Sequence, residues 1–510
     1  MATALNRRRW LAAAALLACC GFAGELAAQW KPPRPRPVSV PVNLMALSEQ
    51  QLLLSVDDGR HGQELWSLDP ATLQAQLLAD LRPGELGSHP SQPVRLGQGA
   101  GAQACFAAND GHSGFELWCS DGSAAGTRRV ADIRPGPEDS VPSALTAVGA
   151  QLLLVADDGR HGFELWRSDG TAEGTRLVAD LQAGAAGSNP RELVALGGRV
   201  FFVADDGRHG SELWVSDGTT AGTRLVKDLR PGAAGAAPAR LTVLGQRLYF
   251  VADDGRHGPE LWTSDGTARG TRLVRDILPG AQGARPAGLT AWQGRLYFAA
   301  DDGRHGIELW TSDGTAAGTR LVHDLRPGAA HGLPAHLTAG ADALYFAASD
   351  GASPVQLWRS NGTSAGTRAV PQGLPAEQAR AALAARAVPG EVVPRQAVPG
   401  GELPNRLLRD GGRLLYAALD AEHGYELWSS DGTAAGTRLL ADLAPGPADS
   451  FPHQFTRLGQ RLFFAADDGE GLTSLWCEQA DGRIVQVALP RGAAAATPVA
   501  AASGRAAEQR

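Results

Sequence analysis

Cysteine is scarce in this chain of 510 residues: there are five, and only Cys105, Cys119 and Cys477 follow the first thirty residues. No paired CxxC spacing is present, which argues against the common zinc frameworks. The net charge is −7 and no basic stripe occurs, so no nucleic-acid partner is expected. A nucleophile elbow, an HExxH motif and a phosphate-binding loop are also missing. These absences leave no catalytic signature, and the informative feature is a repeat.

Nine tryptophans recur within one short stretch of similar sequence. From the second to the seventh they are 48 residues apart, and the intervals of 52 and 70 elsewhere mark an irregular first unit and an insertion. A period near 48 that contains several strand-like runs favours a β-repeat architecture. We interpret these residues as structural anchors that pack between repeats, with an indole N–H that needs an acceptor. They are Trp66, Trp118, Trp166, Trp214, Trp262, Trp310, Trp358, Trp428 and Trp476.

One unit, residues 239–280, shows the pattern. Four short runs (240–244, 247–252, 260–263 and 271–277) are separated by Gly, Asp and Pro, which supply the conformations that tight turns require. The second run is apolar at successive positions, so both of its faces should be covered. Stacking such sheets face to face and closing the row covers every face. The sequence therefore predicts an all-β fold, a β-propeller of four-stranded antiparallel blades.

About nine units fill residues 41–490. Three arrangements remain open: one large ring, a ring with a degenerate unit folded over it, or two smaller rings. An irregular segment, 371–401, divides the units into seven and two, and two units cannot close a ring. We therefore favour a single ring with an insertion at 371–401, preceded by a Pro-rich spacer at 29–40 and followed by a disordered tail at 491–510.

The first 28 residues have the order of an export signal. Arg7, Arg8 and Arg9 precede an apolar stretch, 10–23, which is followed by small residues with cleavage expected after Ala28. The stretch is short for a membrane span, so no transmembrane segment is expected after its removal. A twin-arginine signal and a lipid anchor at Cys19 are the alternatives. We expect a periplasmic or extracellular protein.

Six units carry Glu-Leu-Trp, two further residues and Asp-Gly, and five of them continue with Thr. Examples are 164–171 (ELWRSDGT) and 308–315 (ELWTSDGT). These units resemble the bacterial ELWxxDGT repeat proteins over nearly all of the chain after the signal. The resemblance implies an exported, propeller-like repeat protein and implies no particular activity. The first, second, seventh and ninth units depart from the pattern, the ninth with Cys477-Glu478-Gln479.

Two local features are candidate sites. Cys105 and Cys119 flank one expected hairpin turn; a five-residue loop places them opposite each other, where a disulfide is expected, and a four-residue loop does not. No cofactor is predicted, but the DDGRHG turns carry adjacent carboxylates that could bind Ca²⁺, although Arg208 could instead pair with Asp206 in a structural turn. The candidate calcium ligands are Asp157, Asp158, Asp205, Asp206, Asp253, Asp254, Asp301 and Asp302.

Two functions follow from this organisation. The first hypothesis is an exported non-enzymatic protein that serves as a binding or structural scaffold for a protein or glycan partner, because near-identical loops suit recognition. The alternative is an extracellular hydrolase or lyase with a site at the propeller mouth near 371–401. Acids, histidines and aromatic residues brought together from different blades would favour the enzyme.

Overall fold

The computed structural model describes residues 42–352, 355–370, 405–420, 422–470 and 472–490. The expected export signal at 1–28, the spacer at 29–40, the insertion at 371–401 and the tail at 491–510 lie outside these residues. Within them the chain forms nine four-stranded antiparallel sheets, each a meander of consecutive strands. The one helical element described is a short 3₁₀ turn, η1 (Gly99–Gly101), and no described helix has the length and apolar character that a membrane crossing needs.

The strands follow in chain order, four to a blade. Blades 1 to 3 are β1 (Val42–Ser48), β2 (Gln51–Asp57), β3 (Gln63–Asp69), β4 (Gln74–Ala79); β5 (Ser91–Leu96), β6 (Gln103–Asn109), β7 (Phe115–Ser120), β8 (Arg128–Arg129); β9 (Ser143–Val148), β10 (Gln151–Asp157), β11 (Phe163–Ser168), β12 (Arg176–Ala179). Blades 4 to 6 are β13 (Arg191–Leu196), β14 (Arg199–Asp205), β15 (Ser211–Ser216), β16 (Arg224–Lys227); β17 (Ala239–Leu244), β18 (Arg247–Asp253), β19 (Pro259–Ser264), β20 (Arg272–Arg275); β21 (Ala287–Trp292), β22 (Arg295–Asp301), β23 (Ile307–Ser312), β24 (Arg320–His323). Blades 7 to 9 are β25 (Ala335–Ala339), β26 (Leu344–Ala348), β27 (Gln356–Ser360), β28 (Arg368–Ala369); β29 (Asn405–Asp410), β30 (Arg413–Asp420), β31 (Gly424–Ser430), β32 (Arg438–Ala441); β33 (His453–Leu458), β34 (Arg461–Asp467), β35 (Thr473–Glu478), β36 (Ile484–Val487).

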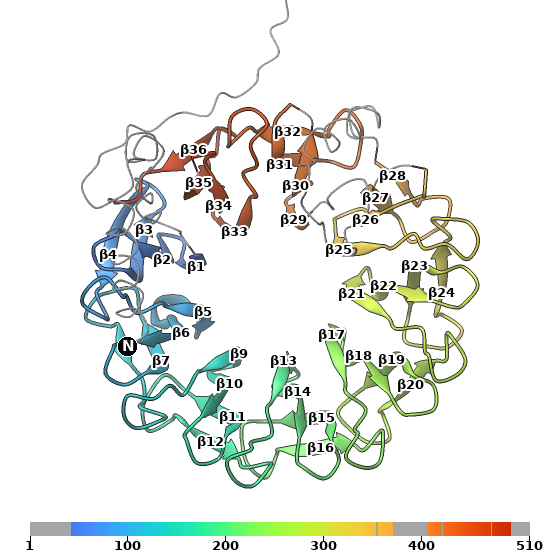
Figure 1. The fold of residues 1–510 in the computed structure, drawn as a ribbon, viewed down its shortest axis with the longest axis horizontal. Helices are drawn as coiled ribbons and strands as arrows, with labels where there is room; N and C mark the ends of the chain where they lie inside the picture. Colours follow the sequence, from blue (N-terminus) through green and yellow to red (C-terminus); the bar gives the residue numbers. More distant parts are fainter. Residues whose placement is uncertain (1–41, 353–354, 371–404, 421, 471, 491–510) are drawn as a thin grey trace, which may run out of the picture. The chain divides into compact units, whose positions relative to one another are not determined.

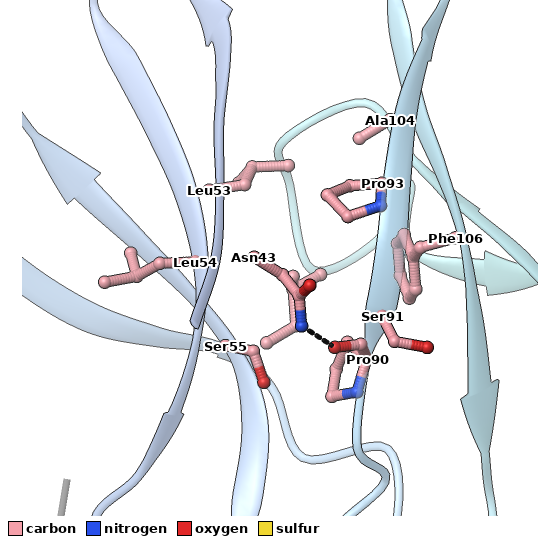
Figure 2. A pocket seen from close by; sticks show the side chains of 10 residues that line it. Asn43, Leu53, Leu54, Ser55, Pro90, Ser91, Pro93, Ala104 and Phe106 are labelled. Atoms are coloured by element: carbon pink, nitrogen blue, oxygen red, sulfur yellow. Dashed lines mark hydrogen bonds between the residues drawn. The ribbon is translucent and has the colours of Figure 1, made fainter. Parts of the chain in front are cut away.

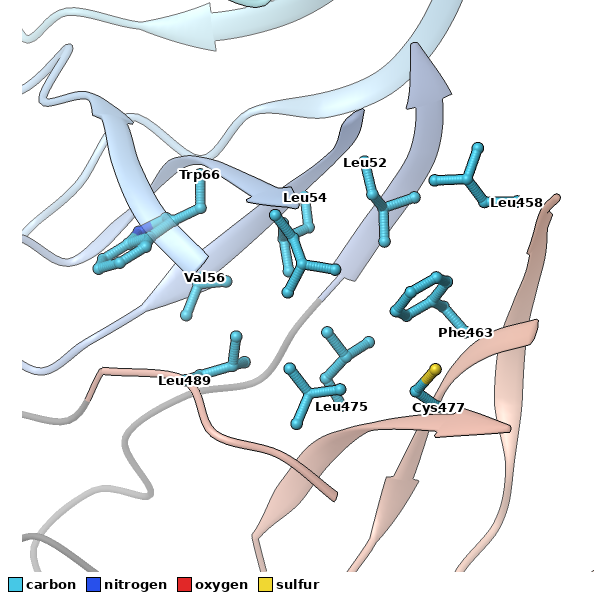
Figure 3. Close-up of a cluster of buried hydrophobic side chains, with 11 residues drawn as sticks. Leu52, Leu54, Val56, Trp66, Leu458, Phe463, Leu475, Cys477 and Leu489 are labelled. Atoms are coloured by element: carbon cyan, nitrogen blue, oxygen red, sulfur yellow. The ribbon is translucent and has the colours of Figure 1, made fainter. Parts of the chain in front are cut away.

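The nine sheets stand in one ring, with the first strand of each blade innermost (Figure 1). The prediction of a single nine-bladed propeller is confirmed, and the alternatives of a folded-over unit or two smaller rings are wrong. Ring closure is visible in the apolar cluster between the first and last blades, where Leu54 and Trp66 face Phe463 and Leu475 (Figure 3). Eight further clusters fill the other blade interfaces. The core is thus divided among the interfaces, as expected for a repeat fold.

The second strand of a blade shows why the sheets stack. In β18 five consecutive residues are buried, so the strand presents apolar side chains to both neighbouring blades. Phe250 is paired with Trp262 on the third strand. All nine repeat tryptophans are at most 9% exposed and lie in the interface clusters or beside them. The indole N–H of Trp262 donates to the carbonyl of Ala252 at 3.1 Å.

Candidate functional site

The DDGRHG turns are closed by their own hydrogen bonds. Oδ1 of Asp206 accepts the backbone N–H groups of Arg208 and His209, each at 2.9 Å, and Oδ2 lies 2.7 Å from Nδ1 of His209. The side-chain partner of this carboxylate is therefore His209. The alternative from the sequence, a pair between Asp206 and the Arg208 side chain, is wrong. The hydrogen bond to Asp206 raises the pKa of His209. Equivalent turns occur at 157–162, 253–258 and 301–306.

Metal binding at these turns stays a prediction. Oδ1 of the first aspartate, Asp205, also accepts a backbone N–H, from Gly207 at 2.8 Å, so both carboxylates of the turn already serve its backbone. Among the described residues, no group of three or more His, Cys, Asp or Glu side chains is arranged to hold a metal ion.

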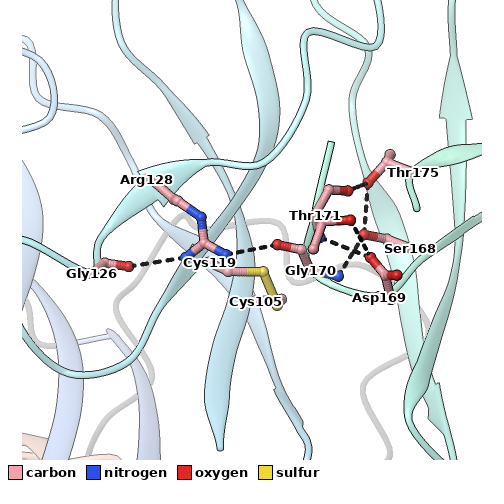
Figure 4. Close-up of a disulfide and its surroundings, with 9 residues drawn as sticks. All are labelled: Cys105, Cys119, Gly126, Arg128, Ser168, Asp169, Gly170, Thr171 and Thr175. Carbon is pink, nitrogen blue, oxygen red and sulfur yellow. Dashed lines mark hydrogen bonds between the residues drawn. A yellow bond between two sulfur atoms is a disulfide. The ribbon is translucent and has the colours of Figure 1, made fainter. Parts of the chain in front are cut away.

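Cys105 and Cys119 are joined by a disulfide inside the second blade (Figure 4). The turn between β6 and β7 has five residues, 110–114, so the two cysteines are direct cross-strand partners with 4.1 Å between their Cα atoms. Both are fully buried. Cys477 is the free cysteine of the described residues, and burial raises the pKa of its thiol to about 11, so it is not a ready nucleophile.

In eight of the nine blades, one position on the innermost strand has a left-handed backbone. The second residue of these strands has φ between 50° and 65°, at a bulge in the pairing with the next strand. Its side chain changes from blade to blade while the surrounding repeat hardly changes. These residues are Asn43, Gln92, Ala144, Glu192, Arg240, Gly288, His336 and Gln454.

Several of these side chains connect neighbouring blades. Oε2 of Glu192 accepts the N–H of Leu241 on the next blade at 2.9 Å, and Oε1 of Gln92 accepts that of Ala144 at 3.2 Å. Glu192 and His336 stand on blades 4 and 7, so the left-handed positions themselves do not place an acid and a histidine on adjacent blades. The enzyme site predicted at the mouth near 371–401 gains no acid–base set from these residues.

A polar pocket of about 410 Å³ lies between blades 8 and 9, at the end of β29 that carries Asp410. Its volume is in the range of small-molecule sites. Two carboxylates and two guanidinium groups, contributed by both blades, converge on it. The side chains that give it chemical character are Asp410, Arg413, Arg457, Gln460, Glu478 and Gln479.

The charges of the pocket form one network. Oδ2 of Asp410 accepts from Nε and Nη2 of Arg413 at 3.0 and 2.7 Å, and the same Nη2 donates to Oε2 of Glu478 across the blade boundary. Nη1 of Arg457 lies 2.7 Å from Oδ1 of Asp410. Both carboxylate side chains are only 7% exposed. Burial lowers the pKa of Arg413, but the hydrogen bonds and charges of Glu478 and Asp410 raise it further, so the net direction is upward.

A shorter turn opens this pocket. In blade 6, Ser312 and Thr319 join their hydroxyls at 2.8 Å to close a long turn, whose Gly314 sits against the hydroxyl of Tyr249 on the preceding blade. In blade 9 a tight turn replaces it, with the N–H of Gln479 bonded to the carbonyl of Arg483 at 2.8 Å. The space that the long turn fills elsewhere is left to Glu478.

The sequence contained part of this signal. The departure of the ninth unit at Glu478 is visible in the sequence. Asp410, which shares Arg413 with it, lies 68 residues earlier, at the end of the first strand of blade 8. Only the stacking of blade 9 on blade 8 brings the two together. A pattern within one repeat unit therefore does not reveal that these two carboxylates meet.

A second cavity, between blades 1 and 2, is not a ligand site. It measures about 10 Å³ and is walled by apolar groups such as Leu53 and Phe106, with Asn43 bonded to the carbonyl of Pro90 at 2.9 Å (Figure 2). A space of this size is at the limit for one water molecule.

The glutamate of the Glu-Leu-Trp sequence is a further buried acid. Glu260 is fully buried, and its Oε1 accepts the backbone N–H groups of Leu278 and Ala284, each at 3.0 Å. These bonds hold the loop that leads from β20 to the next blade. Burial raises its pKa to about 7 against the lowering effect of these bonds. Because the same arrangement recurs around the ring, it is part of the scaffold. Equivalent residues with a pKa raised to about 7 are Glu116, Glu212, Glu308 and Glu426.

Comparison with known proteins gives matches among solved structures alone; no protein-family model and no curated protein matches the chain. A puromycin hydrolase is 15% identical with a TM-score of 0.39, over 90% of this chain and 60% of that chain. A prolyl endopeptidase structure is 13% identical with a TM-score of 0.40, over 67% and 51%. Prolyl oligopeptidase B from Galerina marginata is 11% identical with a TM-score of 0.38, over 67% and 52%. The chain thus spans about half to three fifths of the length of these proteins.

These matches correct the first functional hypothesis. The matched proteins are named as a puromycin hydrolase, a prolyl endopeptidase and a prolyl oligopeptidase, and these names agree with the alternative, a hydrolase, better than with the non-enzymatic binding or structural scaffold. Near-identical loops form in any propeller and did not identify a binding surface. At these identities and scores the likeness concerns the fold, and the reaction has to be argued from the chain's own residues.

Proposed function

We propose that the protein is a hydrolase that works outside the cytoplasm, with its reaction centre in the pocket between blades 8 and 9. The observation that carries the proposal is the convergence of Glu478 and Asp410 from adjacent blades on one guanidinium nitrogen of Arg413. Glutamate and aspartate side chains that are held in place beside a pocket can serve as the acid or base of hydrolysis.

The two carboxylates have different roles in this proposal. Both oxygens of Asp410 are occupied by Arg413 and Arg457, so Asp410 positions the two guanidinium groups. Glu478 uses Oε2 for Arg413, and its Oε1 makes no hydrogen bond within the described residues and lines the pocket. Glu478 is therefore the catalytic residue.

The reaction needs water as the second reactant. Glu478 takes a proton from a water molecule as the water oxygen bonds to the substrate carbon. The same proton passes to the leaving oxygen or nitrogen when its bond to that carbon breaks, which returns Glu478 to its starting form. Nη1 of Arg413 and Nη2 of Arg457, which make no hydrogen bond within the described residues, donate to the leaving oxygen or nitrogen and stabilise the negative charge that develops there as its bond to carbon breaks.

The location rests on two further points. The pattern of residues 1–28 is that of an export signal, and the disulfide between Cys105 and Cys119 suits an oxidising compartment. Membership of the ELWxxDGT repeat proteins, with which the chain shares its Trp-centred units, agrees with export and stays a prediction.

The test is turnover by the purified full chain on panels of oligosaccharide, ester and peptide substrates. Glu478→Gln keeps the shape of the side chain and should lower kcat by about 100-fold or more, the usual contribution of a general base. Glu470→Gln, on an exposed hairpin of the same blade, is the matched control and should leave kcat unchanged. Absence of turnover on every panel, or an active Glu478→Gln, would overturn the proposal.

A further inference from the structure

We infer that the pocket between blades 8 and 9 binds a neutral carbohydrate. This names the substrate class of the proposed hydrolase and rests on that proposal for turnover, whereas binding can be measured by itself. The first argument is charge balance. Two guanidinium groups, of Arg413 and Arg457, face two carboxylates, of Asp410 and Glu478, at hydrogen-bond distance, so the pocket carries no net charge.

Charge balance excludes ligands of either sign. An anionic ligand would have to approach the carboxylates of Asp410 and Glu478, which are shielded from water and repel it. A cationic ligand meets the same difficulty at Arg413 and Arg457. A charged ligand of either sign would meet groups of its own charge beside groups of the opposite charge, so the balanced network favours neither sign, and displacing a paired group is costly.

The pocket offers both hydrogen-bond donors and hydrogen-bond acceptors that have no partner among the described residues. Arg413 offers Nη1 and Arg457 offers Nη2 as donors, while Oε1 of Glu478 is an acceptor; none of these atoms makes a hydrogen bond within the described part of the chain. Gln460 and Gln479 add amides with one acceptor and two donor positions each. A hydroxyl group both donates and accepts, so a ligand with several adjacent hydroxyls can satisfy this set.

A peptide would find little in this pocket besides its backbone. The lining consists of charged and amide side chains together with Gly412, Ala480 and Gly482, and no large apolar side chain takes part. Peptide and drug-like ligands usually derive their affinity from apolar anchors. The volume of about 410 Å³ nevertheless suits a small ligand, and the sugar is the class that needs polar contacts most.

The chain contains a matched pair of arginines for the test. Arg457 in blade 9 and Arg409 in blade 8 occupy the same position of the innermost strand, and Nε of each donates to a backbone carbonyl two residues later, at 3.2 and 3.3 Å. Arg457 lines the pocket and Arg409 does not. Arg457→Met and Arg409→Met therefore remove the same charge in the same local setting.

The experiment is calorimetric titration of the full chain and both variants with tetrasaccharides of glucose and of N-acetylglucosamine. Tetragalacturonate, tetraglucosamine and an Ala-Gly tetrapeptide serve as acidic, basic and peptide probes. A neutral sugar should bind, Arg457→Met should weaken it about tenfold or more, and Arg409→Met should leave it unchanged. Tighter binding of a charged sugar or the peptide, no binding of any probe, or equal effects of the two variants would overturn the inference.

Turnover separates this inference from the proposed function. A neutral sugar that binds through Arg457 and is never cleaved would overturn the hydrolase and leave the carbohydrate site. If a substrate were cleaved in a Glu478-dependent way while Arg457→Met left sugar affinity unchanged, the carbohydrate site would be overturned and the hydrolase would remain.

Discussion

The interface between blades 5 and 6 and the interface between blades 8 and 9 contain equivalent apolar clusters. Phe298 packs between blades 5 and 6, and Phe464 packs at the equivalent place between blades 8 and 9; both are fully buried. The two interfaces differ at the end where the innermost strand turns back. There the first has an apolar edge with Leu244 packed against the cluster, and the second has the charged pocket with Asp410.

The difference arises from few substitutions. Arg247 in blade 5 corresponds to Arg413 in blade 8, and it donates to Oγ1 of Thr263 at 3.1 Å and to the carbonyl of Gly270 at 2.8 Å, within its own blade. In blade 8 the position equivalent to Leu244 holds Asp410, and Arg413 donates to its carboxylate. The next blade supplies Glu478 where the regular repeat has serine. A structural arginine thus becomes part of a site while the blade keeps its fold, which is how function is added to a repeated scaffold.

The largest expected effect tests whether the two apolar clusters are equivalent. Phe298→Ala and Phe464→Ala each remove a fully buried ring, and each should lower the free energy of unfolding by about 3–5 kcal/mol. The measurement is urea-induced unfolding followed by tryptophan fluorescence. A loss below about 1 kcal/mol for Phe464→Ala alone would mean that blade 9 is loosely packed and that the pocket is a packing defect.

The next effect separates the charged ends. Arg413→Met leaves the carboxylates of Asp410 and Glu478 without their shared partner. We expect a loss of about 3 kcal/mol, the lower end for a broken buried pair, because the pocket admits water. Arg247→Met removes two hydrogen bonds to uncharged oxygens and an exposed ion pair with Asp265 at 4.0 Å, and should cost about 1 kcal/mol. The same unfolding measurement checks both.

A triple variant provides the control for this comparison. Asp410→Leu and Glu478→Ser restore the regular residues, and in the Arg413→Met background they should recover most of the lost stability, since paired charges can be replaced by apolar groups at little cost. Equal losses for Arg413→Met and Arg247→Met, or no recovery in the triple variant, would show that the network contributes nothing to the interface.

Much of this comparison could be predicted from sequence, and the part that could not has a physical cause. Strand runs, turns and the Trp anchors recur every 48 residues, and each is decided by neighbours within one unit, so the propeller and its single ring followed from local patterns. The meeting of Glu478 and Asp410 at Arg413 depends on how two blades stack. The choice between Arg208 and His209 as the partner of Asp206 depends on the turn geometry, which brings Nδ1 of His209 to 2.7 Å from Oδ2 of Asp206.

The smallest expected effect concerns the buried glutamates, which blade 9 lacks because Ser474 takes their place. The pKa of Glu260 in the folded protein is about 7, raised by burial from an ordinary value of 4.5. The folded state therefore holds the proton more tightly than the unfolded chain does. The stability that this residue contributes is complete below about pH 4.5 and is lost as the pH rises through 7.

Glu260→Gln should therefore make the free energy of unfolding depend less on pH. Between pH 5 and pH 8 we expect the unchanged protein to lose stability, and the variant to lose less by about 1 kcal/mol or more. Glutamine also weakens the bonds to Leu278 and Ala284, so the informative quantity is the difference between the two pH values and not the stability at either one. Glu470→Gln is the exposed control and should not alter the dependence. If Glu260→Gln preserved the full pH dependence, the carboxylate would have to be ionised throughout. Its backbone N–H bonds, and not burial, would then decide its charge.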